Sequence, residues 1–346
     1  MFSVTSLGFL PFMALLVCLW YRVPQPSRWK LVLAANAVFC LSIDIGAFFA
    51  VALATAVVWQ AAQHAQPEQP SRRGWLALGL AAALLPLLVL KYSGMLVPGL
   101  RDLYKPFGLA YYSLQLAGYL LDVWHGRTAP TPSYARLWCY AGFFLSLTQG
   151  PFNRYNTLMP QLEAAPKTFE TQRLVSGLQR SAWGYFKKFA IADRAAIVVS
   201  AAFADPASFD RSQLIFATVM YSFQLYADFS GYTDIVLGMG EILGLHLPEN
   251  FRQPFFSASV KELWARWHIS LSQWFRDYVY IPLGGNRKGI ARRDANLLLT
   301  FLVSGLWHGA NWTFLVWGGL HGLCQVAEDH MPAPLRKRKS LLLRIV

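Results

Sequence analysis

Charged side chains are scarce in this chain of 346 residues, of which aspartate, glutamate, lysine and arginine make up 14%. Soluble globular domains average about 25% charged residues. Hydrophobic residues make up 55% of the chain, and its mean hydropathy is +0.33. This composition excludes an ordinary water-soluble fold and predicts a polytopic membrane protein whose spanning segments are helices.

Acidic residues are particularly few, since 18 of them stand against 31 lysines and arginines and leave a net charge of +13. In a soluble protein such an excess would indicate binding to nucleic acid. Here the basic residues fall mainly between apolar runs, where the positive-inside rule and anionic lipid headgroups account for them. We therefore expect membrane lipids, and not nucleic acid, as partners of the basic surface.

Side-chain groupings that would bind a metal or form a disulfide framework are also lacking. The cysteines lie singly in apolar stretches and are assigned to packing, at positions Cys18, Cys40, Cys139 and Cys324. The histidines have no ligand spacing, so we expect neither a metal site nor a bound cofactor. No low-complexity linker or internal repeat divides the chain, and we predict one transmembrane domain over residues 1–346.

Long apolar runs dominate what the chain does contain. They cover residues 7–20, 31–60, 75–90, 107–124, 135–150, 181–202 and 212–243. The second run is long enough for two short spans broken near Asp44 and Gly46, and Gly150-Pro151 is expected to end a helix. A span needs about 20 apolar residues, so some runs should be tilted, broken or re-entrant. We predict an all-α protein with about eight to ten transmembrane helices.

Three acidic side chains, Asp228, Asp234 and Glu241, interrupt the apolar run near residues 221–245. Buried carboxylates need a partner or a water-filled cavity. They either form a structural polar network, for example with an arginine of the next segment, or belong to the wall of a reaction tunnel. Arg154 lies at a predicted membrane edge, as a lipid anchor or as a gate for an acyl donor.

The segment at residues 259–287 predicts one amphipathic helix. Ser259 and Glu262 form a capping box at its start, and Pro282 ends it. Tryptophans gather on one arc of this helix and charged residues on the other, as in helices that lie in the membrane interface. His268 falls at the border of the two arcs, beside Trp264. It is either an anchor residue or one member of a catalytic pair.

The segment at residues 304–322, SGLWHGANWTFLVWGGLHG, places two histidines in apolar surroundings. Imidazole exchanges a proton near neutral pH, and a histidine at membrane depth is a functional candidate. If the segment is one helix, Asn311 shares a face with His308 whereas His321 does not. His308 is either a core residue bonded to backbone or a catalytic base, with the bulk of Trp307 beside it.

Several motifs occur in an order that resembles one protein family. ENFRQPF, RWHISLSQWFRDYVYIPLGGNR, SGLWHGANWTF and the following LHG are similar to segments of membrane-bound O-acyltransferases, as are LQLAGYLLDVWHGR and GPFNRYNTLMPQL. The resemblance covers roughly residues 105–330. It is closest for the bacterial branch that includes the alginate O-acetylase membrane subunit. It is more distant for the teichoic-acid D-alanyl transfer protein.

The resemblance implies a ring of helices around a funnel or tunnel in the bacterial cytoplasmic membrane. His308 would match the family's invariant histidine and His268 its second, more variable catalytic position. The implied reaction moves an acetyl group from a cytoplasmic donor, acetyl-CoA, to an extracytoplasmic polysaccharide, directly or through a partner protein. Supporting or tunnel-lining residues are expected at Asn311, Trp307, Trp267, Asp228 and Arg154.

Basic side chains on the cytoplasmic face either hold the phosphates of that donor or anchor the protein to lipid; they are Arg266, Arg276 and Arg287. Three other functions stay open: D-alanyl transfer to teichoic acid, a transporter or flippase with Asp228 as a relay, and a scaffold. Alginate-type members continue beyond the LHG segment, whereas this chain stops at Val346 after a basic stretch. We therefore expect a truncated or a short member.

Overall fold

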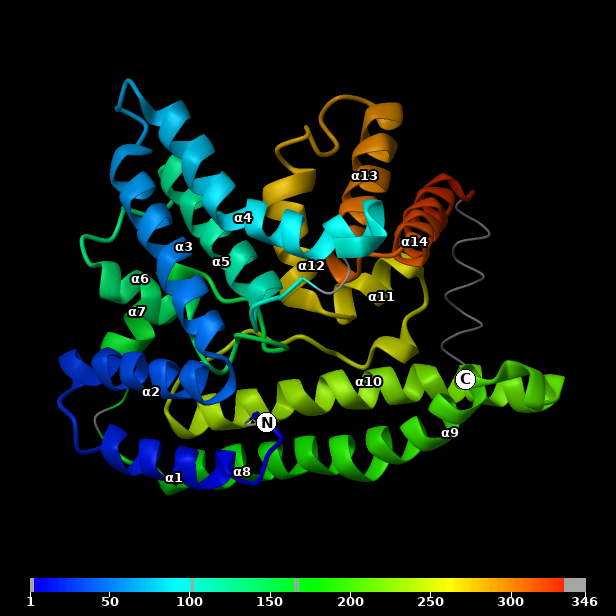
Figure 1. Ribbon diagram of the computed structural model, residues 1–346, viewed down its shortest axis with the longest axis horizontal. Coiled ribbons are helices and arrows are strands. Elements are labelled where there is room, and N and C mark those ends of the chain that lie inside the picture. Colours follow the sequence, from blue (N-terminus) through cyan, green and yellow to red (C-terminus); the bar gives the residue numbers. More distant parts are fainter. Residues whose placement is uncertain (1–2, 101–102, 165, 167, 333–346) are drawn as a thin grey trace. The chain divides into compact units, whose positions relative to one another are not determined.

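All regular elements that the structure describes are helices, as the composition predicts (Figure 1). The structure is a computed structural model and describes residues 3–100, 103–164, 166 and 168–332. By the pattern of contacts between Cα atoms, the chain forms two compact units. Unit 1 comprises residues 1–45 and 142–248, and unit 2 comprises residues 46–141 and 249–346. Each unit is therefore assembled from two segments that are distant in the sequence.

Unit 1 is built around a long helical hairpin. A π-helical turn, Lys187–Ala192, joins α8 (Thr171–Phe186) to α9 (Asp193–Ala204). The returning helix α10 (Arg211–Ile242) lies beside α8 and α9 (Figure 1). The remaining helices of the unit are α1 (Phe9–Trp20), α2 (Arg28–Ile43) and α7 (Tyr155–Ala164).

Glycines allow α8 and α10 to touch through their backbones. A Cβ atom added to Gly184 would lie 2.5 Å from the carbonyl oxygen of Gly231. One added to Gly177 would lie 2.5 Å from the carbonyl oxygen of Gly238. Small residues of this kind favour close helix packing in membranes, where apolar burial does not drive association. Gly177 and Gly184 therefore set the separation of the two helices.

The acidic side chains of α10 are paired across this hairpin. Asp234 forms an ion pair with Lys187 and a second with Arg180 at 3.1 Å, and Lys188 contacts Asp228 at 2.5 Å. Ser176 Oγ donates to Glu241 at 2.5 Å. The interpretation of these acids as a structural polar network is confirmed. Their partners lie on α8 and on the π-helical turn after it and not, as expected, on the next segment, because α10 packs against both.

Unit 2 contains two helical groups. The first comprises α3 (Ile45–His64), α4 (Arg72–Leu96), α5 (Leu109–Trp124) and α6 (Tyr134–Ala141). The second comprises α11 (Val260–Arg266), α12 (Ile269–Phe275), α13 (Ile290–His308) and α14 (Trp312–His330). A π-helical turn, Arg276–Tyr280, follows α12. The hairpin of α13 and α14 is as close as that of unit 1, since a Cβ atom on Gly305 would lie 2.3 Å from the carbonyl oxygen of Phe314.

Two boundary predictions have different outcomes. The break predicted near Asp44 is confirmed, because α2 ends at Ile43 and α3 begins at Ile45. The prediction that a helix ends at Gly150-Pro151 is wrong. The preceding helix already ends at Ala141, and residues 142–154 are irregular. Local apolar composition predicts a span there, but it does not distinguish a helix from a buried irregular segment.

Two of the described helices, α3 and α4, are long and apolar enough to cross a membrane by length and composition. The expected total of eight to ten spans and the central funnel stay predictions. The basic stretch before Val346, at residues 334–346, lies outside the described residues.

Candidate active site

His308 is the last residue of α13, where the helix breaks. Gly309 follows in an extended conformation, with φ −162° and ψ 150°, and α14 starts at Trp312. Asn311 is the N-cap of α14, since its Oδ1 accepts a hydrogen bond from the Thr313 amide at 3.3 Å. Residues 304–322 therefore do not form the single helix considered above, in which Asn311 would share a face with His308. Glycine and asparagine at these positions end one helix and cap the next.

His268 also lies at a break, between α11 and α12. The single helix expected over residues 259–282 is interrupted there, because Trp267 is extended and His268 has φ 45° and ψ 52°. Its start is as predicted, since Ser259 Oγ accepts from the Glu262 amide at 3.0 Å. A left-handed conformation is uncommon for a residue with a side chain, and such strained positions concentrate at functional sites.

Neighbouring backbone from residues 249–252 stabilises the break at His268. The Ile269 amide donates to the Asn250 carbonyl at 3.0 Å, and the Arg252 amide donates to the Arg266 carbonyl at 2.9 Å. The buried Asn250 side chain also accepts from Ser270 Oγ at 2.6 Å. These bonds replace helical ones, so the ENFRQPF motif determines the orientation of His268. Periodicity within residues 259–282 carries no sign of this distant partner.

The two breaks bring His268 and His308 together within unit 2. Their ring centroids are 6.3 Å apart, and the Trp307 ring lies 5.0 Å from His308 and 6.2 Å from His268. His268 is only 1% exposed. Nε2 of His308 is buried and has no hydrogen-bond partner among the residues that the structure describes. A buried imidazole nitrogen with an available lone pair can accept a proton from a substrate.

A cavity of about 410 Å³ lies between α11, α12, α13 and α14, and neither histidine is among its lining residues. Ser304, one helical turn before His308, lines it. Trp264 lines it too and packs on Trp317 at 5.6 Å, and Trp317 lies 5.2 Å from His308. Trp317 thus connects Trp264 of the cavity lining with His308. Its other lining residues include Leu271, Ser272, Phe275, Tyr280, Asn286, Leu297, Thr300, Phe301 and Gln325.

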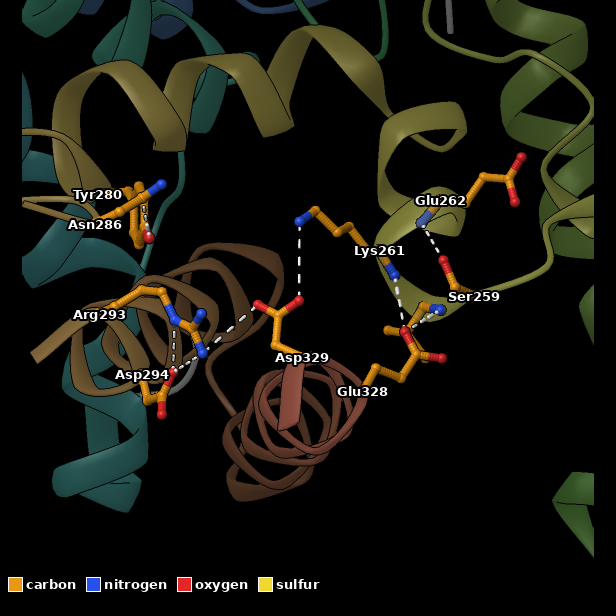
Figure 2. Close-up of polar contacts among 10 residues, drawn as sticks. Ser259, Lys261, Glu262, Tyr280, Asn286, Arg293, Asp294, Glu328 and Asp329 are labelled. Carbon is orange, nitrogen blue, oxygen red and sulfur yellow. Dashed lines mark hydrogen bonds and ion pairs between the residues drawn. The ribbon is translucent and has the colours of Figure 1, made fainter. Parts of the chain in front are cut away.

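Charged side chains are among the residues that line this cavity, and Figure 2 shows the ion pairs that three of them form. Asp329 of α14 lies between Lys261 of α11, at 3.8 Å, and Arg293 of α13, at 4.0 Å (Figure 2). Arg293 also contacts Asp294 at 2.7 Å. The hydrogen bond from His330, followed by that from Arg293, lowers the pKa of the Asp294 carboxyl group. The ion pairs tie the three helices together beside the cavity.

Only one of the three arginines predicted to bind the donor lies at the cavity. Arg276 lines the cavity, whereas Arg266 and Arg287 are not among its lining residues. The Arg266 guanidinium instead contacts Glu262 at 2.5 Å. Two further cations of the lining, Lys261 and Arg293, were missed by the sequence analysis, because helical spacing does not show which charged faces of different helices meet.

The supporting residues predicted from the sequence are also dispersed. Trp307 contacts both histidines, but Trp267 packs against Phe251, with ring centroids 5.1 Å apart. Asn311 is exposed and caps α14. Arg154 and Asp228 belong to unit 1, where Arg154 directly precedes α7. The ring of His321 packs against those of Trp264 and Trp317, with centroids 5.2 and 4.9 Å away.

The family profile and the relatives that match this chain point to the same protein family. The profile of MBOAT, the membrane-bound O-acyltransferase family, matches residues 89–338. A probable alginate O-acetylase AlgI of Azotobacter vinelandii is 36% identical over 330 residues, which are 90% of this chain and 65% of that protein. A probable AlgI of Pseudomonas putida is 35% identical, over 92% of this chain and 68% of that protein. A peptidoglycan O-acetyltransferase of Helicobacter pylori is 33% identical, over 75% and 56%.

The match includes both histidine segments and the cavity. Aligned residues span 65% of the length of the Azotobacter protein. The activity in that protein's name therefore belongs to a chain longer than the part that is aligned here. The family match nevertheless covers well over half of this sequence, and the resemblance inferred from the motifs is confirmed. The chain belongs to the membrane-bound O-acyltransferase family.

Proposed function

We propose that this protein is a multi-pass O-acetyltransferase of the bacterial cytoplasmic membrane. It moves an acetyl group from cytoplasmic acetyl-CoA to an extracytoplasmic polysaccharide, directly or through a partner protein. The observation that supports this most directly is the meeting of the buried His268 with His308, whose Nε2 is buried, in the same unit as a cavity lined by Arg276, Lys261 and Arg293. Relatives named for O-acetylation of alginate and of peptidoglycan support the acetyl group and the glycan acceptor.

His308 acts as the general base in this proposal. Its Nε2 accepts the proton of the acceptor hydroxyl, and the hydroxyl oxygen attacks the thioester carbonyl carbon. The carbon–sulfur bond then breaks, an ester forms, and the proton passes from the imidazolium to the departing thiolate. His268 orients the reacting groups, and the surrounding tryptophans exclude water that would hydrolyse the thioester.

The donor occupies the cavity between α11, α12, α13 and α14. Its phosphates contact the cations at Arg276, Lys261 and Arg293, and its thioester extends past Ser304 toward His308. The apolar lining from Trp264 and Phe301 suits the uncharged pantetheine chain. CoA is then a substrate and not a resident cofactor.

The donor class is tested with purified protein in lipid vesicles and three labelled donors: acetyl-CoA, free acetate and a D-alanylated carrier protein. Label should reach an unacetylated alginate or peptidoglycan fragment from acetyl-CoA alone. Transfer only from the carrier protein would replace the proposal with D-alanyl transfer. Movement of a solute without any acyl transfer would replace it with a transporter.

Arg276→Gln should weaken donor binding. Loss of one charge-assisted contact is expected to raise the KM for acetyl-CoA about tenfold, with kcat little changed. The matched control is Arg292→Gln, which removes the same charge from an exposed position that is not part of the cavity lining. An equal KM for Arg276→Gln and wild type, measured by steady-state transfer, would place the donor elsewhere.

A further inference from the structure

Lys91 carries an ammonium group into α4, one of the two helices apolar enough to cross a membrane. A charge at such a position is costly and is retained for a purpose. The acyl-transfer chemistry proposed above does not use this residue. Its Nζ donates a hydrogen bond to the backbone carbonyl of Trp307, the residue immediately before His308.

Carbonyl groups at the end of α13 need such donors. The last four carbonyls of a helix have no intrahelical partner, and apolar surroundings offer no water to replace it. Gly309 supplies its amide to the Gly305 carbonyl at 3.3 Å, and the chain then leaves the helix. The next two carbonyls are served by adjacent residues of α4: Tyr92 Oη donates to Leu306 at 2.5 Å, and Lys91 donates to Trp307.

The cation at this position also suits the electrostatics of the helix end. The C-terminus of a helix carries a partial negative charge, which a nearby ammonium stabilises. Lys91 Nζ lies 5.7 Å from the centroid of the Trp307 ring, close enough for a cation–π contact. One side chain therefore contacts both the backbone and the ring of the residue before His308.

Helix α5 holds the same tryptophan from another direction. Trp307 Nε1 donates to the Ala110 carbonyl at 3.2 Å, and the Tyr111 ring lies 5.6 Å from the Trp307 ring. The backbone and side chain of Trp307 are thus both fixed by unit 2 residues far away in sequence. Because His308 follows directly, its imidazole is placed by these contacts.

We propose that Lys91 and Tyr92 are positioning residues for His308, acting through the Leu306 and Trp307 carbonyls at the end of α13. This inference rests on the proposed role of His308 as the base. Without these two donors, the Leu306 and Trp307 carbonyls would lose these hydrogen bonds, and the last turn of α13 would change its conformation. The imidazole would then leave the geometry that proton transfer requires.

Three variants of α4 test this role by steady-state transfer. Lys91→Met keeps the length of the side chain and removes the donor, and it should lower kcat about tenfold to 100-fold with an unchanged KM for acetyl-CoA. Tyr92→Phe should lower kcat by about fivefold, since one neutral hydrogen bond is lost. Lys91→Arg keeps a cationic donor and should retain most of the activity. Arg73→Met, which removes a charge from the exposed start of α4, is the matched control.

Amide hydrogen exchange of peptides covering residues 303–311 gives a readout that does not depend on activity. Lys91→Met should exchange faster there than wild type, with unchanged exchange in α10. Unchanged kcat, a higher KM alone, or unchanged exchange at residues 303–311 would each overturn the positioning role. If the wild type transfers no acetyl group, the proposed function fails, whereas the exchange result still decides whether Lys91 fixes the end of α13.

Discussion

Replacing His308 with alanine is expected to lower kcat for acetyl transfer by about 100- to 10,000-fold, the range for removal of a general base. The physical reason is that Nε2 of His308 is buried without a hydrogen-bond partner among the described residues, and is therefore available to a substrate proton. The KM for acetyl-CoA should change little, because the donor phosphates contact the cavity and not the imidazole. Steady-state transfer in vesicles measures both constants.

The matched control for this variant is His125→Ala, which removes an exposed imidazole of unit 2. It should transfer acetyl groups at the wild-type rate. Thermal unfolding of both variants in detergent shows whether either has lost its fold. A folded His308→Ala protein with wild-type kcat would mean that another group is the base.

Substitution of His268 is expected to lower kcat about 100-fold, as misplacement of a reacting group does. His268 contributes both an imidazole 6.3 Å from that of His308 and an unusual backbone conformation with φ 45°. Asparagine tolerates this conformation better than alanine. His268→Asn therefore removes the imidazole alone, whereas His268→Ala also strains the break between α11 and α12.

Comparison of the two His268 variants separates these contributions. Equal losses of kcat in both would assign the effect to the imidazole. Wild-type activity in His268→Asn together with a loss in His268→Ala would mean that His268 only shapes the backbone. That outcome would exclude it from the proton-transfer geometry.

The histidine pair could be predicted from the sequence, but its geometry could not. His268 and His308 were both candidates because of their apolar, tryptophan-rich surroundings and the family resemblance. Residues 259–282 were expected to form one helix because of their helical periodicity, and a single helix was also considered for residues 304–322. The breaks depend on Asn250, which bonds to the backbone at Ile269, and on Asn311, which caps α14. Pairing with a distant segment leaves no periodic signal in the segment itself.

Long-range partners account for the other differences. The acids of α10 were expected in a structural polar network or in a tunnel wall, and their cationic partners are Arg180, Lys187 and Lys188 of the preceding segment. Lys91 attracted no prediction, because a single lysine in an apolar run gives no indication of its acceptor. Only packing of α4 against the end of α13 shows that the acceptor is the carbonyl before His308.

Transfer across a sealed membrane tests the central claim most directly. Vesicles containing the purified protein would enclose an unacetylated alginate fragment, and labelled acetyl-CoA would be added outside. The account predicts that label reaches the enclosed glycan with wild type and with His125→Ala, but not with His308→Ala. Equal labelling of the glycan by wild type and a folded His308→Ala protein would contradict it.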